Sequence, residues 1–206
     1  SATDNFDRSA MLDHLAHAVL LPMHETVASR VAGLPAAIDA HCDALDAGTP
    51  GVTLEAARAA WRDSIDAWEQ VDALLVGPAA MDGKTLRDRI YAWPLLSTCG
   101  IDRDTATSFA DPPSYDVTTK LANVRTLAAI EYLIYSTATA HSCATEPPGW
   151  AALGADLPRA RCRLAVAIAT DVAANVAAVV AAWRPDGDDF SGNLARAGQS
   201  GSSIPS

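Results

Sequence analysis

Apolar residues recur at helical spacing through most of this chain. Between residues 9 and 46 they are separated by three or four positions, and the same spacing returns over about 54–76 and 158–184. A fourth long helical pattern covers about 117–136, and a shorter one covers about 84–93. Few segments alternate with the period of two that marks a strand. The sequence therefore predicts an all-α protein, an up-and-down bundle of four long helices and one short helix.

Two prolines interrupt the first helical pattern, and a change in composition ends the last one. Pro22 predicts a kink, and Pro35 a kink or a break, because proline lacks an amide proton and clashes with the preceding turn. Residues 186–206 are rich in Gly, Ser and Asp. We expect a helical domain over residues 1–185, followed by a linker or mobile tail towards a further domain.

Charge and hydropathy narrow the classes of partner. The net charge of −10 argues against a nucleic-acid partner, because phosphate binding needs a basic face. The most apolar run, Leu164 to Trp183, is interrupted by Thr170, Asp171 and Asn175. We therefore expect a packed helix and no transmembrane segment. No signal peptide is visible, but the start reads as a mature N-terminus, which leaves export open.

The four cysteines leave several pairings open. Cys42, Cys99, Cys143 and Cys162 form no CxxC motif, so a zinc or thioredoxin-like site is not indicated. Cys143 and Cys162 flank a Pro/Gly-rich connection, and a bond between them would staple two helices. The alternative is four buried or free thiols. A reactive His41–Cys42 pair is not favoured.

One glutamate stands out among apolar neighbours. Glu131 falls inside the apolar stripe expected for a helix over 117–136, whose members are Leu121, Val124, Leu127, Ile130 and Ile134. A carboxylate on the core side of a helix must be paired, metal-bound or protonated, because an isolated buried charge is very costly. Glu131 is therefore the central candidate for a functional site.

Several neighbours could complete that site. Arg89 lies near the apolar face of its own segment and is the preferred ion-pair partner of Glu131. Trp93 and Tyr135 are candidates to line a binding pocket, although aromatic residues at helical spacing more commonly form core. We favour an ion pair or a ligand-contacting acid over a metal site at Glu131.

Five segments of the chain carry a family resemblance through their order and spacing: VLLPMHETVASRVAGL, AWRDSIDAWEQVDALLVGP, RDRIYAWP, RTLAAIEYLIY and RCRLAVAIATDVAANVAAVVAAW. Together they resemble the imelysin-like family, also called insulin-cleaving metallopeptidase-like proteins. The resemblance implies an exported bacterial protein, since members are exported, several are lipoproteins, and many are linked to iron. It also implies two helical bundles with a site near their junction, and this chain matches only the first bundle.

The chain departs from the family at its hallmark motif, G-x-H-x-x-E. Aligned on Glu131, the histidine position is Ala128 and the glycine position is Thr126. A histidine and a glutamate three residues apart share one helical face and can both bind a metal, which alanine cannot. Iron or zinc at Glu131, and peptidase activity, are therefore weakened expectations of the resemblance.

The resulting hypothesis is a periplasmic or cell-surface binding protein connected with iron or haem uptake. Its partners would be a small ligand or metal ion and the second helical bundle. One alternative is a metallopeptidase of the imelysin type. Another is a structural or interaction module, in which Glu131 only fixes the helix register against Arg89.

Overall fold

The computed structural model describes residues 6–205, and these form helices and loops without a strand. The first half contains α1 (Arg8–His14), a π-helical turn (Leu15–Leu20), α2 (Leu21–Ala32), α3 (Leu34–Asp46) and α4 (Gly51–Ala73). The second half contains α5 (Thr85–Ile90), α6 (Thr98–Ala110), α7 (Leu127–Tyr135), α8 (Trp150–Leu153), α9 (Leu157–Trp183) and α10 (Phe190–Ala195). Short 3₁₀ turns lie at Gly77–Ala79, Asp82–Lys84, Pro112–Ser114, Val117–Thr119, Ala122–Val124 and Gly154–Asp156. The all-α prediction is confirmed.

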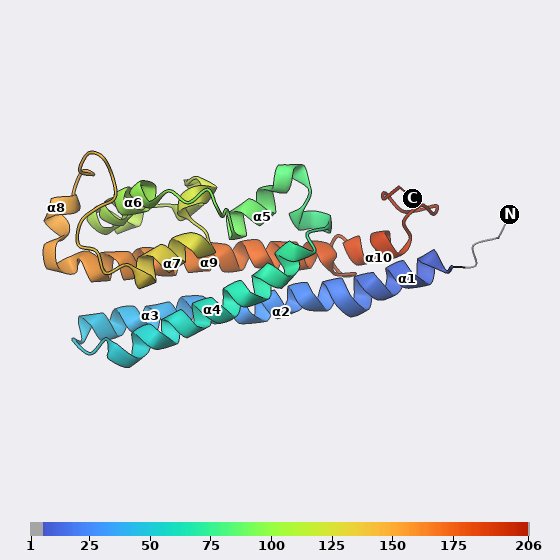
Figure 1. Ribbon diagram of the computed structural model, residues 1–206, viewed down its shortest axis with the longest axis horizontal. Coiled ribbons are helices and arrows are strands. Elements are labelled where there is room, and N and C mark those ends of the chain that lie inside the picture. Colours follow the sequence, from blue (N-terminus) through green and yellow to red (C-terminus); the bar gives the residue numbers. More distant parts are fainter. Residues whose placement is uncertain (1–5, 206) are drawn as a thin grey trace.

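The central element is α9, which runs along most of the elongated molecule (Figure 1). It packs against α2 and α3 on one side and against α6 and α7 on the other, while α4 covers α2, α3 and α7. Residues Trp150–Trp183 are the one described stretch long and apolar enough to cross a membrane, by length and composition alone. Because α9 is packed on several sides and carries buried Arg161 and Asp171, we interpret it as the core helix of the bundle.

Both prolines coincide with the helix irregularities that the sequence predicted. Before Pro22 the helix widens, and the Leu21 amide donates to the Ala16 carbonyl, five residues back. The expected kink thus takes the form of a π-helical turn, and the helix continues to Ala32. Pro35 coincides with a break, since α3 starts only after Gly33.

Two expectations in the middle of the chain are wrong. Residues before Leu127 do not extend α7, because Thr126 is extended and Asp116 accepts bonds from the amide and hydroxyl of Thr118, which closes a local turn. The sequence analysis predicted no helix between residues 93 and 117, but residues Thr98–Ala110 form α6. This helix is rich in threonine and has a weak apolar period, but its N-cap Ser97 accepts a bond from the Gly100 amide.

Part of the expected linker is folded. Asp189 caps α10 by accepting a bond from the Gly192 amide. The Phe190 ring packs edge-on against Trp183 at a centroid distance of 4.9 Å, and α10 also contacts α1. Residues 190–195 therefore belong to the folded body, which was expected to end at residue 185.

The buried His24 is expected to make the stability of this end of the bundle depend on pH. His24 is only 3% exposed, its ring packs at a tilt against Trp183 with a centroid distance of 4.7 Å, and its Nδ1 donates to the Leu20 carbonyl over 2.7 Å. Burial lowers the pKa of His24 below its usual 6.5. The neutral ring therefore stabilises the fold fully above pH 6.5, and this contribution is lost as the pH falls through and below that value.

We expect wild type to lose stability between pH 6.5 and 5 more steeply than His24→Gln. The excess slope should reach at most about 1.4 kcal/mol per pH unit, the limit for one proton. Denaturant unfolding at several pH values measures it. His14→Gln, at an exposed position of α1, is the matched control and should keep the wild-type slope. Equal slopes for wild type and His24→Gln would contradict the prediction.

Candidate functional site

The buried ion pair predicted between Glu131 and Arg89 does not form. Glu131 and Arg89 are both exposed, and among the described residues no hydrogen bond or ion pair joins them. Because α7 begins only at Leu127, the expected stripe does not extend to Leu121, which is 76% exposed. Partial desolvation still raises the pKa of Glu131. The carboxylate thus lies at the edge of the packed surface, not in the core.

The two aromatic candidates lie in different surroundings. Trp93 is 53% exposed in the loop after α5. Tyr135 is half-buried against α4, where its ring meets the edge of Trp61 at 5.6 Å and lies 4.6 Å below the Arg58 guanidinium. Tyr135 does not line the cavity described below, but it contacts Arg58, which does.

The donor set at Glu131 does not fit a bound metal. Ala128 occupies the position where the family motif has histidine, and it is buried. Across residues 6–205 no group of three His, Cys, Asp or Glu side chains is placed to hold a metal ion. Protein metal sites need several such donors in close geometry, so the Glu131 carboxylate by itself does not make a catalytic metal centre.

All four cysteines form disulfides, in a pairing that differs from the one expected. Cys42 joins Cys162, and Cys99 joins Cys143. The expected Cys143–Cys162 staple is wrong because Cys143 reaches across to α6, a helix absent from the prediction. The free-thiol alternative is wrong too, and an oxidised Cys42 cannot form a reactive pair with His41.

A cavity of about 460 Å³ lies beside the Cys42–Cys162 bond, between α3, α4, the loop after α7 and the start of α9. Its apolar walls are Leu45, Leu54, Leu133, Ile134, Leu157 and Pro158. His41, Arg58 and Arg161 supply its ionisable groups, and no Asp or Glu lines it. The volume lies within the range of small-ligand pockets, roughly 300–1,000 Å³.

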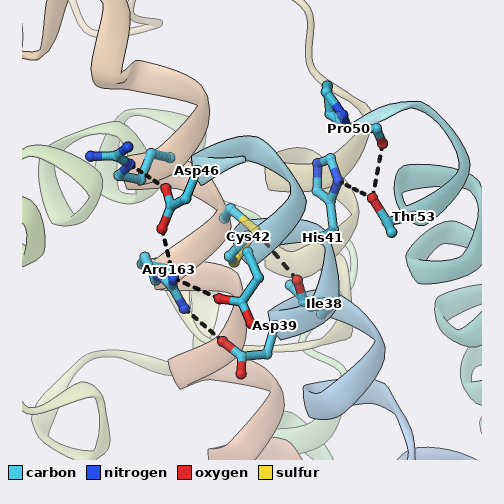
Figure 2. The surroundings of a disulfide bond; sticks show 11 residues. Ile38, Asp39, His41, Cys42, Asp46, Pro50, Thr53 and Arg163 are labelled. Carbon is cyan, nitrogen blue, oxygen red and sulfur yellow. Dashed lines mark hydrogen bonds and ion pairs between the residues drawn. A yellow bond between two sulfur atoms is a disulfide. The ribbon is translucent and has the colours of Figure 1, made fainter. Parts of the chain in front are cut away.

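His41 presents a lone pair to this cavity. Figure 2 shows its ring turned towards Thr53, whose hydroxyl lies 3.2 Å from His41 Nδ1. That hydroxyl donates its single proton to the Pro50 carbonyl over 2.9 Å, so it must accept from His41. Nδ1 therefore carries the proton and Nε2 does not. Burial and the nearby Arg58 charge lower the pKa of His41, which keeps the ring neutral near pH 7.

Arg58 brings a positive charge to the same cavity. Its Nε donates to the Ile134 carbonyl over 3.1 Å, and Nη1 donates to Glu55 over 2.7 Å. No partner of Nη2 exists within the described chain. Glu55 is 64% exposed at its side chain, so this ion pair is open to competition by water or by another anion.

The loop after α7 forms one cavity wall and is anchored on buried charges. Arg161 donates from Nη1 to the Ala138 carbonyl at 2.7 Å, and more weakly to Ser136 at 3.5 Å. Its Nη2 lies 4.0 Å from Asp102. Asp102 is fully buried and accepts bonds from the Ser142 amide and hydroxyl at 2.7 and 2.8 Å. These bonds fix the wall before any ligand arrives.

No local sequence signal marked this site. His41, Arg58 and Arg161 lie on three helices and come together only through the packing of α3, α4 and α9. In the sequence, His41 drew attention only as a neighbour of Cys42. The sequence does place Pro50 and Thr53 at the start of α4, the helix that faces His41 in the structure.

Comparison with known proteins supports the family likeness. The family model for imelysin (peptidase M75) matches residues 20–203. A crystal structure of an imelysin-like protein from Psychrobacter arcticum 273-4 superposes with a TM-score of 0.62 at 16% identity, over 92% of this chain and 54% of that one. This chain thus spans about half the length of that neighbour. No curated protein sequence matches it.

Proposed function

This chain belongs to the imelysin family, and we propose that it works outside the cytoplasm as a ligand-binding protein, with the cavity beside the Cys42–Cys162 bond as its binding site. The observation that carries the proposal is the neutral His41 lone pair in the same cavity as the Arg58 charge, where most of the walls are apolar. Such a combination of apolar walls with a few convergent polar groups is typical of small-molecule sites.

Two disulfides support the proposed location. Disulfides form and persist in oxidising compartments, such as the bacterial periplasm and cell surface, and are rare in the cytosol. Cys42–Cys162 and Cys99–Cys143 together use every cysteine of the chain. A periplasmic or cell-surface position accords with the expectation from the family.

The metallopeptidase alternative has less support. A peptidase of this type needs a metal that activates water, held by several protein donors. Glu131 is exposed and lacks the motif histidine, so the described donor set offers no such site. The described residues therefore support a ligand-binding site better than a catalytic metal site.

Within this proposal, we suggest that the ligand is connected with iron or haem uptake. A bare ion would find only one neutral imidazole in the cavity, which is too few donors. Haem suits it better, since a porphyrin is apolar, carries carboxylates for Arg58, and holds an iron that accepts a neutral imidazole nitrogen. His41 Nε2 would be the iron ligand.

Titration of the protein with haem, followed by its visible absorption, tests this proposal. We expect binding with a shifted absorption band in wild type and in Glu131→Gln, and at least about tenfold weaker binding in His41→Asn. Ferric, ferrous and zinc ions should show no comparable binding in wild type or in His41→Asn, because the cavity offers them only one donor. Haem binding that is lost in Glu131→Gln and retained in His41→Asn would move the site to Glu131. Chelator-sensitive cleavage of a protein substrate would favour the peptidase.

A further inference from the structure

The cavity beside the Cys42–Cys162 bond also specifies the chemistry of what it accepts. We infer that it takes an apolar organic acid, whose carboxylate pairs with Arg58 and whose hydroxyl or N–H group donates a hydrogen bond to His41 Nε2. This inference rests on the proposed function, since it needs the cavity to be a ligand site. It names a ligand class that does not require iron, because a hydrogen-bond donor takes the place that the haem iron would have at His41 Nε2.

The charge of the cavity selects an anion. Arg58 and Arg161 line it, and no carboxylate does, although the whole chain carries a net charge of −10. Arg161 Nη1 donates to the loop carbonyls, and its Nη2 lies 4.0 Å from Asp102, while Nε and Nη2 are buried and have no hydrogen-bond partner among the described residues. We assign the ligand carboxylate to Arg58 because its side chain is 20% exposed and that of Arg161 is 6% exposed. Arg58 Nη2 has no partner in the described chain, and the bond from Arg58 to Glu55 is at the surface. A carboxylate can therefore pair with the Arg58 guanidinium at low cost.

The His41 ring selects a donor. Its Nδ1 proton is committed to Thr53, so Nε2 can only accept. His41 is 7% exposed and lines the cavity, so a donor on a ligand can replace water at Nε2. An ammonium group could supply that donor, but the Arg58 charge would repel it. A hydroxyl or neutral N–H group fits both constraints.

The walls select an apolar body between these two polar ends. Leucine, isoleucine and proline side chains cover the cavity from α3, α4, α7 and α9. The chain thus offers one cationic contact, one acceptor and an apolar space between them. An aryl or alkyl acid with a hydroxyl group has the matching pattern.

Calorimetric titration with three probes of similar size tests the inference near neutral pH. They are 4-hydroxyphenylacetate, phenylacetate and tyramine, which differ in the hydroxyl and in the sign of the charge. We expect 4-hydroxyphenylacetate to bind tightest, phenylacetate to bind several-fold more weakly, and tyramine to bind at least about tenfold more weakly. In His41→Asn, which keeps a donor to Thr53 but loses Nε2, the two acids should bind alike.

Arg58→Gln should weaken both acids by about tenfold or more. Arg62→Gln is the matched control, because Arg62 lies one turn further along α4, is exposed, and bonds to the Tyr135 hydroxyl outside the cavity. It should leave binding within about twofold. Circular dichroism establishes that each variant is folded, and amide chemical shifts in wild type locate the probe without any substitution. We expect those shifts at residues 136–139 and around His41.

The outcomes separate the two proposals. Tyramine binding as tightly as 4-hydroxyphenylacetate would overturn the ligand class and leave the cavity as a binding site. Shifts that map away from residues 136–139 and His41, or equal losses in Arg58→Gln and Arg62→Gln, would overturn the assignment of Arg58 and His41. If neither haem nor any of the three probes enters the cavity, the proposed function fails together with the inference.

Discussion

Replacing Asp171 with leucine is expected to lower the free energy of unfolding by about 3–5 kcal/mol. Asp171 lies on α9 and accepts a 2.6 Å bond from Arg125 Nη1, and both side chains are less than one-tenth exposed. Removing the acid leaves a buried guanidinium without a counter-charge. The measurement is denaturant unfolding near neutral pH with the disulfides intact.

A double-mutant cycle isolates the pair. Arg125→Met should cost about as much as Asp171→Leu, and the double variant should cost clearly less than the two single losses together, because two apolar side chains can fill the space without a stranded charge. Asp39→Asn is the control. It removes an acid that pairs with Arg163 at the surface, shown in Figure 2, and should change stability by no more than about 1 kcal/mol. Additive losses would show that the two groups are not coupled.

The long helices were predictable because their apolar faces repeat over many turns. α9 was expected over 158–184 and occurs at Leu157–Trp183, since a pattern of that length outweighs local exceptions. α6 was not predictable in the same way. Its buried positions include the polar residues Asp102, Asp104 and Thr105. A pattern of apolar residues therefore does not mark the buried face of this helix.

The ion pair expected at Glu131 was predicted from a rule that applies elsewhere in the chain. An acid buried in an apolar helix does need a partner, but Glu131 is exposed on α7 while its neighbour Ile130 is buried. Asp171 interrupts the most apolar run of the chain and does have an arginine partner, Arg125. That partner is 46 residues away in sequence and lies before α7, so only the tertiary packing reveals it.

Replacing Cys42 and Cys162 together with alanine is expected to cost about 2–5 kcal/mol of unfolding free energy, because their bond removes much of the disorder of the unfolded chain. The two residues are 120 apart in sequence, against 44 for Cys99 and Cys143.

In the loop-entropy picture the longer span should make the first pair worth more than the second, by about 1 kcal/mol or less. Denaturant unfolding of both double variants and of fully reduced wild type measures the comparison. The Cys42–Cys162 bond also clamps α3 to α9 beside His41, so its loss frees one wall of the cavity at the position that presents Nε2. A larger loss from the Cys99–Cys143 pair would contradict the loop-length argument. It would instead favour the anchoring of the loop after α7, through Ser142 and Asp102, as the main source of disulfide stabilisation.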